Sequence, residues 1–184
     1  FTEEKEYLRP DGSVVCTELF QCTFSVQADA YWIAWDSTFS GVQPFYFGDQ
    51  EEMGLGVRLA TSLSELNGGS LRDSLGRTGA KDIWSQAAQW CDYSGTLDGE
   101  RLEVTVMAHP DNFRPSWWHA RNYGFMAANP FGRQAMKKGD QSRIEVRPNE
   151  PFRLRYGVWI HSGSVPGITH IEQAYTRYLV LAGN

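Results

Sequence analysis

The chain has 184 residues, of which 22 are acidic and 17 basic, so its formal net charge is −5. Hydrophobic residues make up 41% and charged residues 21%, which indicates a folded globular domain and excludes a disordered chain. The lack of a basic excess argues against nucleic acid as a partner. No apolar run approaches the roughly 20 residues of a membrane-spanning helix. Composition therefore favours one soluble domain over residues 1–184, either cytoplasmic or periplasmic, and identifies no cofactor.

The cysteines do not form a recognisable framework. Cys16, Cys22 and Cys91 are odd in number and include no CxxC pair, which argues against paired disulfides and against a cysteine zinc site. We expect all three to be small buried hydrophobic residues.

Short apolar runs separated by turn residues dominate the chain and predict β-strands. Asp98-Gly99, between two of these runs, is typical of a tight hairpin. In chain order, the predicted strands are Val14–Val26, Tyr31–Phe39, Gly56–Thr61, Ala87–Asp92, Leu102–Ala108, His119–Met126, Arg143–Val146 and Phe152–His161.

The last predicted strand shows how the faces are divided. Leu154, Tyr156, Val158 and Ile160 occupy every second position, a period that is typical of a half-buried antiparallel strand. In the run Glu103–Ala108, Val104, Val106 and Ala108 likewise point one way.

One helix is expected, at the end of the chain. Thr169 and Glu172 have the spacing of a capping box, and apolar residues then follow at helical intervals. The pattern predicts an amphipathic helix near residues 170–182. With the strands, this gives an all-β fold: an antiparallel β-sandwich with one C-terminal helix.

Residues 109–132 contain the densest set of chemically active side chains. If residues 117–124 are extended, Trp117, His119, Arg121 and Tyr123 lie on one face, and Trp118 lies on the other. An aromatic ring can stack on a sugar, an imidazole can move protons near neutral pH, and a guanidinium can hold a carboxylate. The spacing therefore favours a polar cleft in which only one of the two tryptophans contacts a ligand.

A second candidate segment carries three carboxylates beside glycines. Asp49, Glu51 and Glu52 precede a short run that ends at Arg58, and the segment matches neither a phosphate loop nor a dinucleotide fingerprint. A buried Glu52 beside an arginine should stay ionised, which favours a role as general base over one as general acid. We expect Asp49 to contact substrate and Arg58 to hold an oxyanion or carboxylate.

The remaining histidines give a weaker signal. His161 ends the last predicted strand, where it is expected to line the cleft. A metal site built from His109, Asp111, His119 and His161 is an alternative, but the chain contains no HxH or HxxxH unit, so we assign no metal.

Several motifs, in order from about residue 8 to residue 163, give the chain a resemblance to one protein family. The family is the soluble bacterial one that is labelled "methane oxygenase PmoA". The motifs are Glu52-x-x-x-Gly56-Val-Arg58, Gly68-Gly69, Trp90-x-Asp92-Tyr93-Ser94-Gly95, Asp98-Gly99, His109-Pro110, Trp118-His119-x-Arg121-x-Tyr123-Gly124, Asn129-Pro130-Phe131-Gly132 and Arg153-Leu154-Arg155-Tyr156 with His161.

This resemblance implies a sandwich similar to the galactose-mutarotase-like folds and a role in sugar degradation. It does not imply methane oxidation, because the enzyme of that name is an integral membrane protein and this chain has no spanning segment. Members of the family are typically longer, and their upstream histidine-rich segment is not found here. The resemblance therefore implies that the chain is the C-terminal part of a larger protein. Two departures are Cys91 and the Met53-Gly54 pair after Glu52.

The leading hypothesis is a carbohydrate-active domain of epimerase, lyase or hydrolase type. His119 and Glu52 would be the acid/base pair acting on a sugar, glycan or uronate. The expected substrate-binding residues are Arg121, Arg58, Trp117, Trp118, Tyr123, Asp49 and His161. The alternatives are a non-catalytic carbohydrate-binding or interaction module and a metal-dependent oxygenase-like enzyme. If half of the sandwich is missing, an exposed apolar sheet face should make the chain a homo-oligomer or cause aggregation.

Overall fold

The computed structural model describes residues 1–27, 30–163 and 168–183. These residues form three antiparallel sheets, two short 3-10 turns and two α-helices. The largest sheet has seven strands, in the spatial order β1 (Thr2–Leu8), β2 (Val14–Val26), β3 (Ala30–Ser40), β12 (Phe152–Ser162), β8 (Glu100–Ala108), β7 (Trp90–Leu97) and β6 (Ser70–Asp73).

The other elements are shorter. A three-stranded sheet has the order β5 (Leu55–Arg58), β10 (Phe125–Asn129) and β9 (Trp117–Arg121), and β11 (Ile144–Val146) pairs with β4 (Phe45–Phe47). The helical elements are η1 (Thr61–Leu63), η2 (Glu65–Asn67), α1 (Ala80–Ile83) and α2 (Ile168–Leu181).

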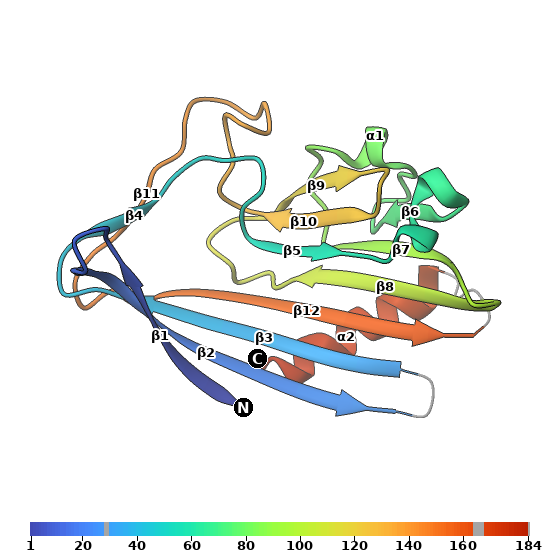
Figure 1. Cartoon of the computed structure of the whole chain (residues 1–184), viewed down its shortest axis with the longest axis horizontal. Coiled ribbons are helices and arrows are strands. Elements are labelled where there is room, and N and C mark those ends of the chain that lie inside the picture. The colour runs from blue at the N-terminus through green and yellow to red at the C-terminus, as the bar shows by residue number, and fades with distance from the viewer. Residues whose placement is uncertain (28–29, 164–167, 184) are drawn as a thin grey trace.

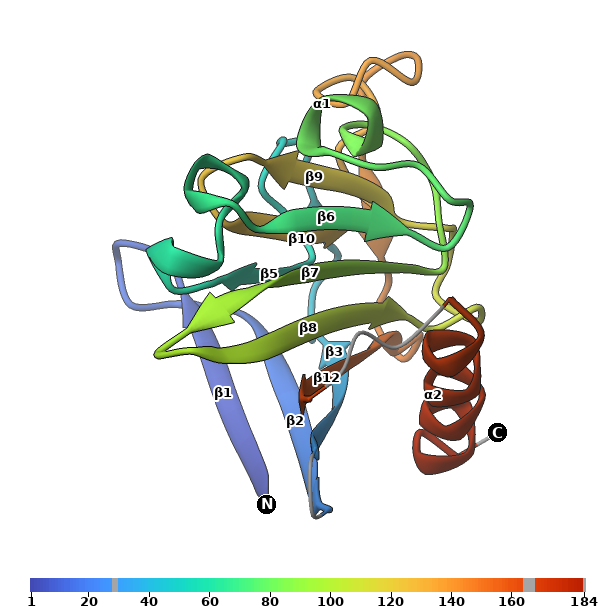
Figure 2. The same ribbon diagram turned by 90° about the vertical axis from the view of Figure 1, so that its right-hand side faces the viewer.

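The molecule has three layers. The three-stranded sheet lies over the β6–β7–β8 part of the seven-stranded sheet (Figure 1), and α2 lies along the other side of that sheet, beside β8 and β12 (Figure 2). Between the two sheets lies a core that includes Val106, Tyr156 and Trp118, and between the large sheet and α2 lies a second core that includes Trp159 and Tyr178. The predicted all-β, sandwich-like fold is confirmed.

The alternating pattern of the last strand predicts one buried and one solvated face, but the structure buries both faces. Leu154, Tyr156 and Val158 face the inter-sheet core as predicted, but β12 is not half-buried. Trp159 on the opposite face is also buried, because α2 covers that face. A helix docked on a sheet turns a pattern typical of one solvated face into a strand buried on both.

The hairpin and cysteine predictions are confirmed. Asp98 and Gly99 have φ angles of 53° and 85°, and they join β7 to β8 as the two-residue turn that such dihedrals permit. Cys16, Cys22 and Cys91 are buried, and their thiols are free.

Three predicted strands are wrong in extent. The run His119–Met126 is two strands, because residues 122–124 form the turn between β9 and β10. Gly56–Thr61 ends at Arg58, and Ala87–Asp92 begins only at Trp90. Sequence analysis also missed β1, β4 and β6, which are short or polar, and the single-turn α1.

The C-terminal helix is confirmed with an earlier start. α2 begins at Ile168, so Thr169 lies inside it and is not its N-cap. Instead of closing a capping box, the Glu172 carboxylate accepts a hydrogen bond of 3.1 Å from the Trp90 indole. Ile171, Tyr175 and Tyr178 form the buried face, as their spacing predicts.

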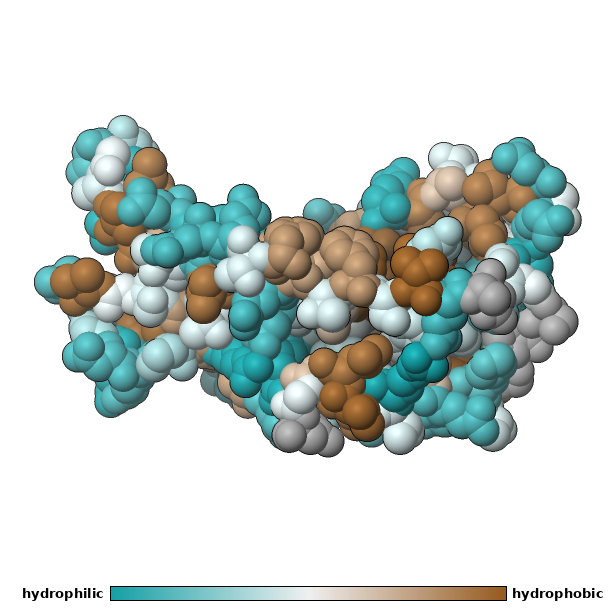
Figure 3. All heavy atoms as spheres, turned by 90° about the horizontal axis from the view of Figure 1, so that it is seen from below, coloured by the Kyte–Doolittle hydropathy of each residue, from teal (hydrophilic) through white to brown (hydrophobic). Residues whose placement is uncertain are grey.

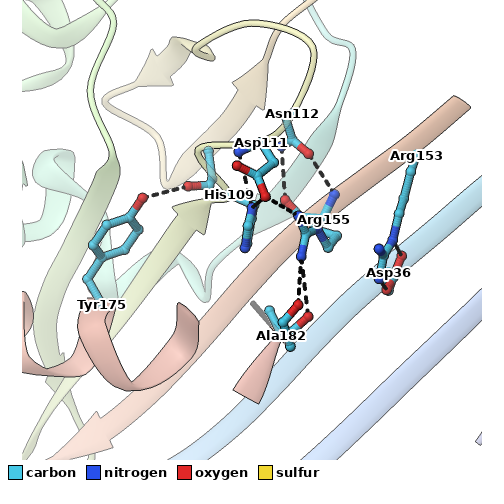
Figure 4. A network of polar contacts seen from close by, with 10 residues as sticks. Asp36, His109, Asp111, Asn112, Arg153, Arg155, Tyr175 and Ala182 are labelled. Atoms are coloured by element: carbon cyan, nitrogen blue, oxygen red, sulfur yellow. Dashed lines mark hydrogen bonds and ion pairs between the residues drawn. The ribbon is translucent and has the colours of Figure 1, made fainter. Parts of the chain in front are cut away.

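A polar network fixes the far end of this helix to the sheet (Figure 4). The Arg155 guanidinium donates to the carbonyls of Ala182 and Gly183 at 3.4 and 3.2 Å and to the Asp111 carboxylate at 2.7 Å. Tyr175 donates to the carbonyl of Ala108 at 3.1 Å. The last carbonyls of a helix have no intrahelical partner, so a buried arginine is a stabilising ligand for them.

Among the helices of the described residues, none combines the length and apolar character needed to cross a lipid bilayer.

Candidate functional site

The candidate site lies on the outer face of the three-stranded sheet. Trp118 and Ala120 of β9 point into the inter-sheet core, so Trp117, His119 and Arg121 alternate with them on the opposite face. This much of the predicted face is present. Tyr123 does not extend it, because it lies in the turn after β9.

The His119 imidazole is fully buried although it points away from the core. The acidic loop before β5 covers it, and the Phe125 ring packs against it edge-on at 5.5 Å. Two segments about 70 residues apart in sequence therefore meet at this histidine, and both contain residues that sequence analysis selected.

Asp49 and Asn129 hold the loop in place. The Asp49 carboxylate accepts hydrogen bonds from the backbone N–H groups of Gln134, Ala135 and Ser142 at 2.8, 3.0 and 2.7 Å. Burial acts to raise the pKa of Asp49, but these three amides hold the pKa below its usual value. Asp49, expected to contact substrate, is here engaged in anchoring the loop.

Asn129 completes the anchor from β10. Its amide donates to the carbonyls of Gln50 and Glu51 at 2.8 and 2.9 Å, and its oxygen accepts from the N–H groups of Phe131 and Gly132. A Cβ at Gly132 would stand 2.4 Å from the Gln50 carbonyl oxygen, so only glycine allows the loop to come this close.

Two carboxylates flank the buried imidazole. Glu51 Oε1 lies 3.4 Å from His119 Nδ1, and Glu52 Oε1 lies 3.6 Å from Nε2. Neither ring nitrogen makes a hydrogen bond to any group in the described part of the chain. Burial lowers the pKa of His119, the charge of Arg121 lowers it further, and the two carboxylates oppose this without reversing it. The histidine is therefore neutral near pH 7.

The two glutamates differ in their surroundings. Glu51 Oε1 accepts hydrogen bonds from Arg121 Nη2 at 2.7 Å and from the Trp84 indole at 2.9 Å, so its position is fixed. Glu52 is 64% exposed, and it faces His119 without a hydrogen bond to that ring. Glu52 is thus the carboxylate that a ligand can reach.

A cavity of about 670 Å³ adjoins this cluster. Arg121 and Trp84, which both bond Glu51, line this cavity, and Lys81 adds a second positive charge. Its remaining lining includes Glu65, Leu66, Gly79 and Asn122. With two cations against the one carboxylate of Glu65, and with an indole ring, the lining suits an anionic ligand with an apolar face.

The other predicted residues lie apart from this cluster. Trp118 is a core residue whose indole donates to the Ala88 carbonyl at 3.1 Å. The Arg58 guanidinium stacks over the Tyr123 ring at 4.7 Å, beyond the end of β5. Trp117 is half-buried under the side chain of Arg114, at 5.5 Å.

His161 belongs to the opposite side of the large sheet. It is buried beside Trp159 and His170, under the start of α2. The structure therefore does not bring it to His119. The proposed metal ligands are equally scattered, because His109 lies at the exit of β8, near Arg155 and Tyr178. Over residues 1–27, 30–163 and 168–183, no group of three or more His, Cys, Asp or Glu side chains is arranged to hold a metal ion.

Sequence analysis missed Trp84 and Lys81. It noted Glu51 among the three carboxylates of the loop but did not select it as a site residue. Nothing in the sequence near α1 carries a motif, and the pairing of Trp84 with Glu51 joins residues 33 apart. Only the docking of α1 beside β9 brings them together.

A protein-family model described as "Family of unknown function (DUF6807)" matches residues 1–176. The chain belongs to this family. The comparison with curated proteins gave no match. The description of DUF6807 names no substrate, activity or organism, so the methane-oxygenase-labelled resemblance stays an interpretation of the motifs.

Proposed function

We propose that this DUF6807 protein acts on an anionic sugar, such as a uronate, by acid/base chemistry at the loop over β9. The observation that carries the proposal is a buried, neutral imidazole held between two carboxylates, one fixed and one exposed, beside a cationic and aromatic cavity. Titratable groups in unequal surroundings are a frequent feature of acid/base sites.

Glu52 is the group that would touch the substrate. It is exposed, while His119 beside it is fully buried. A proton taken by Glu52 can pass to Nε2 of His119, which is 3.6 Å away and makes no hydrogen bond within the described residues. In this proposal, Glu52 is catalytic and His119 is a proton-holding and positioning residue.

Arg121 and Lys81 would hold the carboxylate of the sugar. Arg121 is 35% exposed and borders the cavity, and its bond to Glu51 fixes one side of the guanidinium. If Glu52 removes a proton next to the sugar carboxylate, negative charge develops on that carboxylate, and the two cations stabilise it. This chemistry supports epimerisation or elimination better than hydrolysis.

The test is a panel of uronates and neutral sugars, with turnover and binding measured separately. We expect D-glucuronate or D-galacturonate units to raise the melting temperature, and Glu52→Gln to abolish turnover while leaving binding within about threefold. Arg121→Met should weaken uronate binding and leave any neutral-sugar binding unchanged. Glu145→Gln, at an exposed glutamate on β11, is the matched control.

A non-catalytic carbohydrate-binding module is the second candidate, favoured by the complete burial of His119. It predicts that Trp84→Ala removes sugar binding, while Glu52→Gln and His119→Ala leave it unchanged and no uronate is converted. Binding of neutral sugars alone, unaffected by Arg121→Met, would contradict the choice of an anionic sugar.

A further inference from the structure

A buried carboxylate lies on the inner face of the large sheet, on β2, whereas β9 belongs to the three-stranded sheet. The Glu18 side chain of β2 is 5% exposed, although its neighbours on that face of β2 are Cys16 and Phe20. Burying a charge among apolar side chains is costly unless hydrogen bonds and an opposite charge compensate it.

Side chains from the two neighbouring strands supply that compensation. The Tyr7 hydroxyl donates to Glu18 Oε2 at 2.6 Å, Lys5 Nζ lies 3.7 Å from the same oxygen, and Ser37 donates to Oε1. The Trp35 indole in turn donates to the Ser37 hydroxyl at 2.9 Å. Burial and the bond to Glu18 raise the pKa of Tyr7, so the phenol keeps its proton.

A cavity of about 260 Å³ opens directly over these groups. Lys5, Tyr7, Glu18 and Ser37 contribute its polar side. The rest of its lining is mostly apolar and includes Phe39, Phe47, Met53, Leu55, Phe131 and Leu154. Pockets with a few convergent polar groups on an otherwise apolar lining are typical small-molecule sites.

We propose that this cavity binds a small, neutral, polyhydroxylated ring, such as a cyclitol or a monosaccharide. Lys5 and Glu18 are the charged side chains in the lining, and their charges compensate each other, so the lining has no net charge to attract an ion. A carboxylate offers about four acceptor positions, of which Tyr7 and Ser37 use two, and the ammonium offers three donors. Hydroxyl groups, which donate and accept, match this mixture, and the aromatic rings match the C–H faces of the sugar ring.

The site is distinct from the one proposed for acid/base chemistry, and its binding does not depend on that chemistry. The same loop forms a wall of each: Glu51 and Glu52 cover His119, while Met53, Gly54 and Leu55 line this cavity. Ligand binding here should therefore be detectable in the backbone of residues 53–55.

The experiment is a titration of the ¹⁵N-labelled chain with myo-inositol, D-glucose and piperidinium, followed by amide chemical shifts. We expect both polyols to shift the amides of Glu18, Ser37, Met53 and Leu55. Tyr7→Phe and Ser37→Ala should each weaken binding about five- to tenfold through the loss of one hydroxyl. Tyr7 is 44% exposed, so Tyr7→Phe should fold even if Ser37→Ala does not, and Tyr31→Phe at the 56% exposed Tyr31 is the matched control.

Three outcomes would overturn the proposal. The first is that the polyols leave these amides unshifted while the chain is folded. The second is that they shift only the amides around Trp84 and Arg121. The third is that piperidinium binds in their place, which would identify Glu18 as a receptor for organic cations.

Discussion

At the scale of single residues, Asn129 does more for the candidate site than any residue selected from its chemistry. It is fully buried, and each end of its side-chain amide makes two hydrogen bonds, to the acidic loop on one side and to residues 131 and 132 on the other. The carboxylates over His119 therefore depend on a residue that touches neither of them.

We expect Asn129→Ala to lower the free energy of unfolding by about 3 kcal/mol, because it leaves buried amides and carbonyls unpaired. Asn122→Ala, at an exposed asparagine in the neighbouring turn, should change it by less than about 0.5 kcal/mol. Urea denaturation measures both. Equal effects of the two substitutions would show that Asn129 does not anchor the loop.

The histidines should make stability depend on pH. Burial lowers the pKa of His109, with a further contribution from Arg155, and burial also lowers that of His119. A pKa that is lower in the folded state means that the unfolded state binds protons first. The stabilisation is therefore present above the unfolded pKa of about 6.5 and is lost as the pH falls through the folded value.

His109→Asn isolates one of these contributions, because its side-chain oxygen can replace Nδ1, which accepts from the Asp111 N–H at 3.2 Å. We expect the variant to lose less stability than the parent between about pH 7.5 and pH 5 in urea titrations.

Asp92 works in the opposite direction, since burial raises its pKa to about 6. Its stabilisation is full below the usual pKa of 3.8 and lost as the pH rises through 6. An unchanged loss in His109→Asn would show that His109 does not titrate differently on folding.

At the scale of elements, β12 shows how one strand serves two surroundings. Arg153 and Arg155 are two positions apart on one face, yet the Arg155 side chain is 9% exposed and the Arg153 side chain is 50% exposed. Arg155 contacts the end of α2, whereas Arg153 pairs with Asp36 at the surface (Figure 4). The alternation alone could not distinguish them.

We expect Arg155→Met to destabilise the protein by about 2–3 kcal/mol and to loosen the last turn of α2, because its carbonyls lose their donor. Arg153→Met should cost less than about 1 kcal/mol, as is usual for a surface ion pair. Thermal melts measure the loss of stability in each variant, and hydrogen exchange of the α2 amides measures how far the last turn of the helix loosens. Faster exchange in both variants would argue against a specific anchor.

The elements that sequence analysis missed share a physical reason. β1 is an edge strand with a polar sequence, so its pairing with β2 is not visible as an apolar pattern. The alternation of aromatic and polar residues through 117–124 predicts one extended segment, although Asn122-Tyr123-Gly124 is a turn. As a result Tyr123 was expected at the site and lies beside Arg58 instead.

At the scale of the whole molecule, the two main sheets are unequal. The three-stranded sheet ends at β5, so part of the inner face of β2, β3 and β12 remains uncovered and borders an apolar cavity of about 520 Å³. Phe24 and Phe1, at its edge, are 59% and 68% exposed. Apolar side chains also gather along the middle of the face seen from below (Figure 3).

Because exposed apolar surface of this kind promotes association, we expect the chain to self-associate as its concentration rises. Phe24→Ser should shift sedimentation toward the monomer, whereas Val42→Ser, at a residue that is 89% exposed in a turn, should not. A parent chain that stays monomeric at all concentrations would contradict this prediction.

The sequence by itself determined the fold class, most strand positions, the Asp98-Gly99 hairpin and the helix face of Ile171, Tyr175 and Tyr178. These features follow from local periodicity and turn chemistry, which depend only on residues close together in the sequence. It also selected His119, Glu52 and Arg121. Only the tertiary structure decided that Glu51 and Trp84 join them, that Asp49 is an anchor, that Trp118 is core and that His161 lies behind the sheet. Those outcomes depend on which distant segments pack together, and a period of two identifies a face without saying what covers it.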